Sequence, residues 1–308
     1  MKNIIEGILP LWKDKGMTSF DCVFKARKLL GIKKVGHAGT LDPEVDGVLP
    51  IGVGKGTKIL EYMLDSGKTY AGELCLGFST STEDATGKVI DQKSVDQDIS
   101  SEEIDEALKG FVGEIEQTPP MFSAVKVDGK RLYEYAFEGI EIERPSRIIE
   151  IYKIKRTSDL IFDSENKTMR FSFEVSSSKG TYIRTLAVDI GKKLGYPAHM
   201  SKLTRIESGN IKKEDTVSLK ELEDAASDGK ISELLLPIEY GLDIFPTFEI
   251  NEEIFQQVIN GRVFPTDQFE INDYPVVFTY QNKAIAVYDH HPSKKGIIKP
   301  AKVLRTEM

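Results

Sequence analysis

VGHAGTLDPEVDGVLPIGVG, residues 35–54, is the stretch from which the rest of this chain can be interpreted. Its five glycines and two prolines surround one histidine and one Leu-Asp-Pro tripeptide. Glycine allows positive φ or a close approach of the backbone to a ligand, whereas proline fixes φ and interrupts regular structure. Because Asp42 precedes Pro43, its backbone is biased toward an extended conformation. We therefore predict a rigid glycine-rich loop that presents the Asp42 carboxylate.

Composition places the chain among ordinary globular proteins. Its 308 residues are long for one core, which favours a large domain with a smaller one. The two cysteines are too few for a disulfide framework and fit a reducing compartment. The longest early apolar run, residues 8–12, is too short for a signal peptide or a membrane span. We therefore expect a cytoplasmic protein without a membrane partner.

The net charge of −8 by itself argues against nucleic-acid binding, because such binding depends on phosphate neutralisation. The basic residues are nevertheless clustered. One group precedes residue 60, and a second, between residues 126 and 147, is interleaved with aromatic residues. This combination suits a folded RNA with unstacked bases. On charge alone, a solvated surface remains the simpler interpretation.

Capping residues and hydrophobic periodicity predict an α+β fold. Helices are expected from Thr18 or Ser19 to Leu30, after Ser100, and over residues 182–194, 218 onward and 251–260. Strands are expected over residues 70–78, 148–154, 169–175, 276–280, 284–288 and 297–303. Alternating apolar and polar residues in several of these segments indicate half-buried antiparallel strands. The prediction is a mixed, mainly antiparallel central sheet with flanking helices and a small β-rich C-terminal domain.

Two domains are expected, residues 1–240 and residues 245–308, because the sequence pattern changes at Phe245-Pro246 to one short helix followed by short strands. We expect few contacts across that boundary. Residues 118–146 form a long polar segment that opens with two prolines, and we interpret it as an excursion from the core. Residues 52–58 lack the residue order of a phosphate-binding loop, and the histidines lack metal-ligand spacing with the cysteines. Neither a metal nor a cofactor is therefore expected.

Three motifs resemble the TruB family of tRNA pseudouridine synthases. Residues 36–50 follow the pattern Gly-His-x-Gly-x-Leu-Asp-Pro-x-x-x-Gly-x-Leu-Pro of that family's catalytic loop. Residues 179–184, KGTYIR, are similar to its Lys-Gly-Thr-Tyr-Ile-Arg motif, and residues 119–136 are similar to its insertion that closes on RNA. The resemblance covers roughly residues 4–210. One departure is Asp14, which stands where the family usually has proline, so a looser turn is expected there.

The resemblance assigns three catalytic residues. It implies that Asp42 is the nucleophile, as a carboxylate can be in glycosyl transfer. Arg184 would pair with Asp42, because a bidentate arginine orients a carboxylate and stabilises its charge. Tyr70 would stack on the target base. Glu44 and Asp46 occupy free positions of the pattern, and we expect both at the surface. Taken without the resemblance, Arg184 would be a solvated helix residue and Tyr70 the start of an edge strand.

The resemblance also assigns residues that bind the RNA. His37 would occupy the space that the flipped nucleotides vacate, Asp84 would contact RNA near the target, and Leu203 would line the base pocket. In the insertion, the candidate phosphate contacts are Lys126, Lys130 and Arg131. The Pro-rich entry of the insertion suggests that it orders on binding. The C-terminal domain, residues 245–308, would be PUA-like and bind RNA.

The function implied is cofactor-free isomerisation of uridine to pseudouridine at position 55, in the T loop of tRNA. The partner would be the T stem-loop of tRNA, with no obligatory protein partner, and we expect a monomer. Two alternatives stay open. One is a tRNA-binding or tRNA-folding protein in which catalysis is secondary, and the other is a pseudouridine synthase for another RNA. The sequence does not decide whether Asp42 attacks the sugar or the base.

Overall fold

The computed structural model describes residues 5–95 and 99–307. Contacts divide the chain into two compact units. The unit that we call the terminal unit contains the chain up to Pro43, residues 48–64, and the chain from Gly209 onward. The unit that we call the middle unit contains residues 44–47 and 65–208. The two ends of the chain therefore belong to the same unit.

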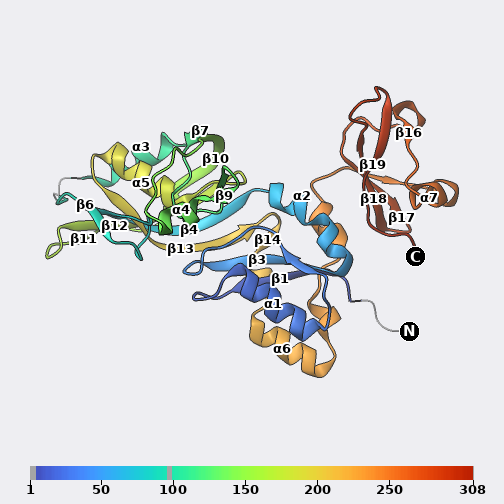
Figure 1. The fold of residues 1–308 in the computed structure, drawn as a ribbon, viewed down its shortest axis with the longest axis horizontal. Helices are drawn as coiled ribbons and strands as arrows, with labels where there is room; N and C mark the ends of the chain where they lie inside the picture. Colours follow the sequence, from blue (N-terminus) through green and yellow to red (C-terminus); the bar gives the residue numbers. More distant parts are fainter. Residues whose placement is uncertain (1–4, 96–98, 308) are drawn as a thin grey trace. The chain divides into compact units, whose positions relative to one another are not determined.

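The middle unit is built on a sheet in which neighbouring strands are mostly antiparallel (Figure 1). Its strand order is β13 (Ala198–Ser208), β4 (Lys68–Leu76), β12 (Thr168–Ser177), β10 (Arg147–Arg156) and β7 (Gly113–Gln117). The short β11 (Ile161–Asp163) pairs with β12. One parallel pairing, in which residues 204–205 of β13 match residues 46–47, makes the sheet mixed. The predicted fold class is thus confirmed.

Periodicity explains why these segments form strands. In β12, Phe171, Phe173 and Val175 are buried while the residues between them are half-buried, as expected of a strand with one face on a core. Helices α3 (Ser101–Lys109) and α5 (Ile183–Leu194) contact each other and pack on β10 and β13 respectively (Figure 1). A separate two-stranded sheet joins β5 (Phe78–Thr80) and β6 (Val89–Gln92).

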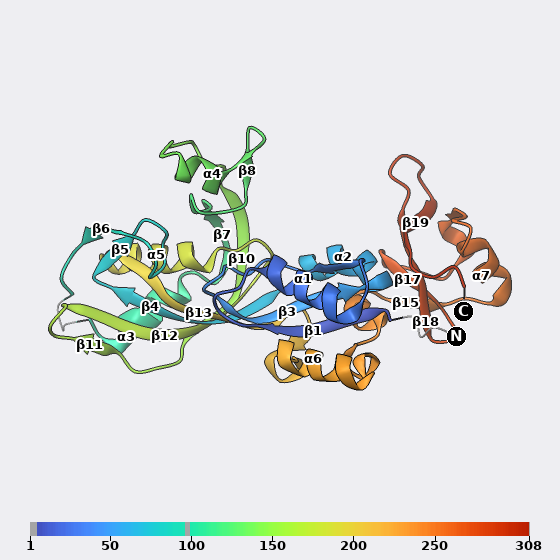
Figure 2. The same ribbon diagram turned by 60° about the horizontal axis from the view of Figure 1, so that its bottom comes forward.

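The polar segment after residue 118 leaves the sheet of the middle unit, as expected. It contains β8 (Lys126–Val127), β9 (Lys130–Arg131) and α4 (Leu132–Phe137). Figure 2 shows these elements standing away from β7 and β10. Asp128 and Gly129 both have positive φ, 50° and 83°, which is the geometry of a tight two-residue hairpin turn.

The terminal unit holds the glycine-rich stretch apart from residues 44–47, which belong to the middle unit. Strand β1 (Gly7–Lys13) lies beside β3 (Asp46–Val53), which pairs antiparallel with β2 (Val35–His37). Helix α1 (Ser19–Leu30) packs against α6 (Leu219–Asp228). The prediction of one long glycine-rich loop is therefore wrong at both ends of the stretch. Strand β3 is almost entirely buried, and Gly52 lies where a Cβ atom would be 2.8 Å from the Gly56 carbonyl oxygen, so close packing requires its glycine.

Short 3-10 helices, labelled η, lie between the longer elements together with a short α-helix and a short strand. They are η1 (Gly54–Ile59), α2 (Leu60–Asp65), β14 (Ile211–Lys212), η2 (Lys213–Asp215), η3 (Ile231–Leu234) and η4 (Ile238–Leu242). Among the helices within residues 5–95 and 99–307, none combines the length and the hydropathy needed to cross a membrane.

The C-terminal residues form the small β-rich part that the sequence predicts (orange to red in Figure 1). Its strand order is β15 (Thr247–Glu249), β17 (Val276–Tyr280), β18 (Lys283–His290), β19 (Ile297–Val303) and β16 (Phe264–Pro265). Helix α7 (Glu252–Val258) and the turn η5 (Thr266–Gln268) complete it. Aromatic and aliphatic side chains fill its core, with the rings of Phe278 and Tyr288 stacked at 4.4 Å between centroids.

The expectation of few contacts across Phe245-Pro246 is wrong. One hydrophobic cluster of the terminal unit combines residues from both sides of that point, namely Ile8, Val48, Ile59, Met63, Ile238 and Leu242 with Val277, Ala284, Val287 and Leu304. Polar contacts also link residues on the two sides of Phe245-Pro246. Lys58 Nζ donates to the Val303 carbonyl at 2.7 Å, and Arg305 Nη1 donates to Glu239 Oε1 at 2.7 Å. The last strands therefore complete a core that begins at β1.

Candidate active site

Asp42 is half-buried in the turn between β2 and β3, and the residue before it is fixed to helix α1. The Leu41 N–H donates to Ser19 Oγ at 2.9 Å, and the Ser19 hydroxyl donates back to the Leu41 carbonyl at 3.2 Å. Ser19 is buried at the first position of α1, where Thr18 caps the helix. This reciprocal pair holds the backbone that leads into Asp42.

The residue after Asp42 is also fixed. The Pro43 carbonyl accepts from the Gly16 N–H at 2.9 Å and from Lys13 Nζ at 3.2 Å. Lys13 is fully buried, and its ammonium also donates to the carbonyls of Asp14 (3.0 Å) and Met17 (2.6 Å). The Asp14 carbonyl is thus one of the groups that close this turn, in the place where the family usually has proline. Asp42 is presented from a segment held on both sides.

Arg184 is the second residue of α5, in the middle unit, and its guanidinium is buried. Nη1 donates to the Thr82 carbonyl at 2.9 Å, and Nη2 donates to the Phe122 carbonyl at 3.0 Å. Nη1 also lies 3.7 Å from Asp84 Oδ2. Arg184 therefore joins the loop after β5 to the first residues of the insertion. It is not the solvated helix residue that its position alone suggested.

The motif KGTYIR forms the entry to α5, and β7 holds it in place. Gln117 Nε2 donates to the Tyr182 carbonyl at 3.0 Å, and the Tyr182 N–H donates to Gln117 Oε1 at 2.8 Å. Arg147 donates to the Gly180 carbonyl and lies 5.0 Å from the centre of the Tyr182 ring. Gly180 has φ +79°, a conformation that favours glycine. These contacts fix the first turn of the helix that carries Arg184.

Asp84 is enclosed by its own loop. Its Oδ1 accepts from Thr82 Oγ1 at 2.6 Å, from the Thr86 N–H at 2.9 Å and from Thr86 Oγ1 at 2.5 Å. Oδ2 is the oxygen that faces Arg184. Since one carboxylate oxygen is occupied by three donors, the orientation of the other is determined. The geometry thus makes Asp84 a neighbour of Arg184.

Tyr70 lies on β4 between two strands, not on a sheet edge. Its register partners are Val175 on β12 and Arg205 on β13, and both Tyr70 and Arg205 are buried. Arg205 is thus the neighbour of Tyr70 on the adjacent strand, and burial lowers the pKa of Arg205. Burial, with the charge of Arg205 nearby, lowers the pKa of Lys68 to about 8. Tyr70 therefore lies on a central strand, beside a buried arginine on the next strand.

Leu203, His37 and the two carboxylates that follow Asp42 in the sequence lie in different surroundings. Leu203 is buried on β13 opposite Gly72, in the same sheet as Tyr70. His37 is half-buried at the end of β2, in the terminal unit. Asp46 is half-buried and accepts from Thr204 Oγ1 at 2.6 Å, so the expectation that it lies at the surface is corrected. Glu44 is exposed, as expected.

The insertion carries the predicted basic residues beside aromatic rings. Arg131 Nη1 donates to the Tyr133 hydroxyl at 2.7 Å. Lys130 forms an ion pair with Glu138 and lies 4.7 Å from the centre of the Tyr135 ring. Lys126 is exposed. Because Lys130 already has an acidic partner, Lys126 and Arg131 are the better placed of the three to meet phosphates.

Sequence reasoning missed Ser19, Gln117 and Glu83. Ser19 had a signal, because it stands in a helix-capping sequence, but its partner Leu41 is 22 residues away. Gln117 is buried, and the polar run around it gave no sign of that. Glu83 adjoins Asp84 in a loop that sequence periodicity does not describe. Each of these residues bonds a residue close in sequence to a predicted site residue: Leu41 precedes Asp42, and Tyr182 and Thr185 lie on either side of Arg184.

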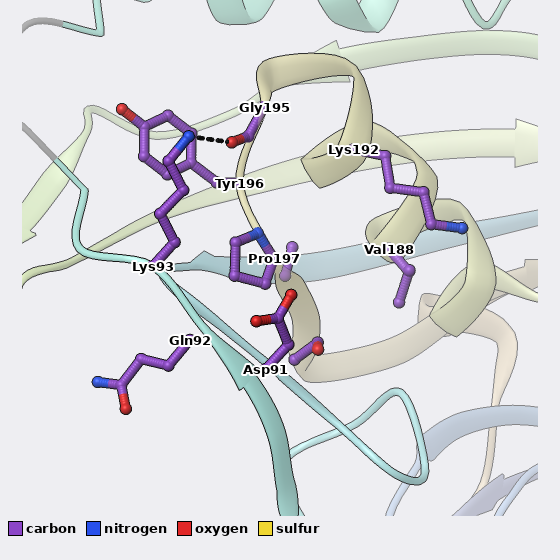
Figure 3. A pocket seen from close by; sticks show the side chains of 10 residues that line it. Asp91, Gln92, Lys93, Val188, Lys192, Gly195, Tyr196 and Pro197 are labelled. Carbon is purple, nitrogen blue, oxygen red and sulfur yellow. Dashed lines mark hydrogen bonds between the residues drawn. The ribbon is translucent and has the colours of Figure 1, made fainter.

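An open pocket lies elsewhere in the middle unit, at the C-terminal end of α5 (Figure 3). Lys93 lies 4.5 Å over the ring of Tyr196 there and donates to the Gly195 carbonyl at 2.7 Å. The predicted site residues do not line this pocket. Among the residues that the structure describes, no group of three His, Cys, Asp or Glu side chains is placed to hold a metal ion.

Two family models match consecutive parts of the chain. A model described as "TruB family pseudouridylate synthase (N terminal domain)" matches residues 27–183. A model described as "tRNA pseudouridylate synthase B C-terminal domain" matches residues 184–243, directly after it. The chain belongs to the TruB family of pseudouridylate synthases. The first match contains the Asp42 turn and the loop of Asp84, and the second begins at Arg184.

Curated relatives of this TruB-family chain span nearly its whole length. A protein of Bacillus pumilus named "tRNA pseudouridine synthase B" is 55% identical over 305 residues, which is 98% of each chain. A protein of the same name from Bacillus subtilis is 50% identical and also covers 98% of each chain. A third, from Listeria innocua, is 51% identical over 98% of this chain and 99% of its own.

Solved structures share the fold of this TruB-family chain. The Cbf5–Nop10–Gar1 complex contains a chain with a TM-score of 0.75 and 28% identity, covering 97% of this chain and 85% of that one. A structure of an H/ACA ribonucleoprotein bound to a substrate RNA containing 2'-deoxyuridine has a TM-score of 0.71 at 24% identity and shows the same fold. As a TruB-family pseudouridine synthase, the chain is an isomerase that converts uridine to pseudouridine.

Proposed function

We propose that this enzyme isomerises the uridine at position 55, in the T loop of tRNA, with Asp42 as its nucleophile. The observation that carries the proposal is the fixed backbone on both sides of Asp42, where Leu41 is bonded to Ser19 and Pro43 to Gly16 and Lys13. A nucleophile that attacks a flipped nucleotide has to be held in place before the substrate arrives. The names of the curated relatives support tRNA as the substrate.

The reaction breaks the glycosidic bond, turns the base and rejoins it through carbon. Asp42 would form the covalent intermediate, as carboxylates do in retaining glycosyl transfer. An ionised carboxylate in a site closed by RNA needs a cation, and Arg184 is proposed as that cation. Asp84, 3.7 Å from Arg184, would hold the guanidinium in its orientation. No step of this chemistry calls for a cofactor.

Binding requires the target base to leave the stack, at a cost of about a few kcal/mol. Tyr70 would stack on the extruded base and Leu203 would line its pocket, which recovers part of that cost. His37 would fill the space that the nucleotide leaves. All three assignments rest on the family motif, together with the placement of Tyr70 and Leu203 in one sheet.

The insertion supplies the proposed contacts to the RNA backbone. The exposed Lys126 is the register partner of the exposed Arg131, which lies 5.7 Å from the centre of the Tyr133 ring. The rings of Phe122 and Phe137 form an edge-to-face pair at 5.8 Å. The Phe122 carbonyl accepts from Arg184, so the insertion is bonded to the site at its base. Closure of the insertion on the T stem-loop would then act on the same arginine that is proposed to pair with Asp42.

We propose further that the enzyme works as a monomer in the cytoplasm, without an obligatory protein partner. The second candidate is a pseudouridine synthase for another RNA, favoured by the likeness to a chain of the Cbf5–Nop10–Gar1 complex. The curated relatives match over nearly their full length at higher identity, and their names favour tRNA. A tRNA-binding protein with secondary catalysis is a weaker candidate, since binding alone does not require a fixed carboxylate.

The test is to map pseudouridine in unmodified tRNA transcripts incubated with the purified protein. We expect pseudouridine at position 55 in the parent transcript and none elsewhere. A transcript with cytidine at that position should show no product, while a ribosomal RNA fragment serves as a control for the second candidate. Modification of the control RNA without modification of tRNA would overturn the tRNA assignment.

A further inference from the structure

Glu83 is half-buried, and the proposed mechanism assigns no role to its carboxylate. Its Oε2 accepts from the Thr185 hydroxyl at 2.6 Å. Its backbone carbonyl accepts from the Met200 N–H at 3.0 Å, and its N–H donates to the Thr80 carbonyl at 3.1 Å. One residue thus bonds the loop of residues 80–86 to α5 through its side chain and to β13 through its backbone.

The backbone of Glu83 is in a conformation that glutamate rarely adopts. Its φ is +64°, in the left-handed region, where residues other than glycine are strained. Such strain persists where the surrounding contacts determine the conformation, and it is concentrated at functional sites. A glycine would relieve the strain at this position, so the carboxylate has to contribute something that a glycine does not.

The contacts of the adjoining residues show what the carboxylate can do. Thr82, on one side of Glu83, accepts from Arg184 Nη1 at 2.9 Å through its carbonyl. Asp84, on the other side, presents Oδ2 to the same nitrogen at 3.7 Å. Thr185, the partner of Glu83, directly follows Arg184 in α5. The Glu83–Thr185 bond therefore ties the loop that contacts the Arg184 guanidinium to the helix that carries Arg184.

We propose that Glu83 and Thr185 form a latch that fixes residues 80–86 on the first turn of α5 and thereby positions the Arg184 guanidinium. Glu83 is a positioning residue, since it acts through Arg184 and touches no reacting atom. The consequence for catalysis rests on the proposed role of Arg184. Burial raises the pKa of Glu83, whereas the Thr185 bond and the charges of Arg184 and Arg144 act in the opposite direction.

The latch requires an acceptor oxygen at the end of the side chain of residue 83 and a hydroxyl donor at residue 185. Variants that keep or remove either group therefore test it. Glu83→Gln keeps the length and one acceptor, whereas Glu83→Gly removes the latch and relieves the backbone. Thr185→Val removes the donor, and Thr185→Ser restores it. Asp105→Asn is the matched control, because it weakens the Arg156–Asp105 ion pair of the same unit (2.9 Å) without touching Arg184.

The measurements are the single-turnover rate of pseudouridine formation and the Kd for tRNA. Glu83→Gly and Thr185→Val should each lower the rate at least tenfold with Kd within threefold of the parent, whereas Glu83→Gln, Thr185→Ser and Asp105→Asn should stay within threefold in both. In a protein that already carries Arg184→Lys, the addition of Glu83→Gly should lower the rate by less than a further twofold. A parent-like rate for Glu83→Gly, or its full effect in the Arg184→Lys background, would overturn the proposal.

Hydrogen exchange separates this proposal from the proposed function. In the RNA-free protein, amides of residues 80–86 should exchange faster in Glu83→Gly and Thr185→Val than in Glu83→Gln. Unchanged exchange in all variants would overturn the latch, whatever the substrate is. If the parent modified no tRNA while exchange responded as expected, the proposed substrate would be wrong and the latch would stand.

Discussion

Ser19 and Leu41, which are 22 residues apart in the chain, exchange two hydrogen bonds between the first turn of α1 and the residue that precedes Asp42. Both residues are buried, so neither bond competes with solvent. On the other side of Asp42, Gly16 and Lys13 hold the Pro43 carbonyl. The position of the proposed nucleophile is thus determined by a helix start and a turn that contain no catalytic group.

Ser19→Ala should therefore weaken catalysis through the backbone of Asp42. The substitution leaves the buried Leu41 N–H without its acceptor, which costs about 1–3 kcal/mol of folding free energy. We expect a single-turnover rate about tenfold lower, with unchanged Kd for tRNA. Ser218→Ala, which removes the cap of α6 at a cost of about 1 kcal/mol, is the control and should keep the parent rate. Equal rates for the two variants would contradict the positioning role of Ser19.

Arg184→Met should be more damaging than its place on a helix suggests. The variant loses donors to the Thr82 and Phe122 carbonyls and, if the proposed pair exists, leaves Asp42 without a cation. Removing one partner of a buried ion pair typically costs about 3–5 kcal/mol. We expect turnover to fall at least a hundredfold, with a smaller loss in Arg184→Lys, which keeps the charge. Near-parent turnover of Arg184→Met, in a folded protein, would rule out the pair with Asp42.

The insertion should control the salt dependence of RNA binding. Lys126→Ala and Arg131→Ala should each lower the slope of log Kd against log salt by about one unit, because each would remove one phosphate contact. Lys130→Ala should change the slope less, since Lys130 is paired with Glu138. Lys220→Ala on α6 is the control, because that lysine is exposed and paired with Asp224. A slope that is the same in the Lys126 and Lys220 variants would place the insertion away from the RNA.

Removal of residues 245–308 should destabilise the terminal unit. The deletion exposes the apolar partners of Val277, Val287 and Leu304, and burial of each such side chain contributes about 1.5–3 kcal/mol. It also removes the carbonyls to which Lys58 donates. We expect insoluble protein or a much lower Tm, whereas a chain that ends after Arg305 should melt like the parent. A well-folded deletion with the parent Tm would show that the shared core is dispensable.

Much of the fold could be predicted from local signals. The Thr18 cap and the Gly31 stop define α1, and residues 276–280 and 297–303 are strands with the predicted bounds. Strand β3 could not be recognised, because its glycines and proline are typical of a loop, although close packing requires the glycines at positions 47 and 52. Strand β13 was missed because its polar residues conceal the alternation, as with Lys202, which forms an ion pair with Glu73 at 3.2 Å.

The proposed site residues could be assigned from local motifs, whereas contacts between residues distant in the chain could not be predicted. Asp42 and Arg184 each stand in a motif that identifies them. Ser19 and Glu83 act on partners 22 and 102 residues away, and no local pattern signals either contact. The shared core across Phe245-Pro246 was missed for the same reason, since residues 277–304 pack there with residues as distant in the chain as Ile8 and Val48.

Asp42→Asn tests the assignment of the nucleophile most directly. The substitution keeps the shape of the side chain and removes its charge and nucleophilic oxygen. Single-turnover formation of pseudouridine at position 55 should become undetectable, while Kd for tRNA stays within about tenfold, or about 1.4 kcal/mol, because phosphate contacts elsewhere dominate binding. Product at an appreciable fraction of the parent rate would contradict the assignment of Asp42 as the nucleophile.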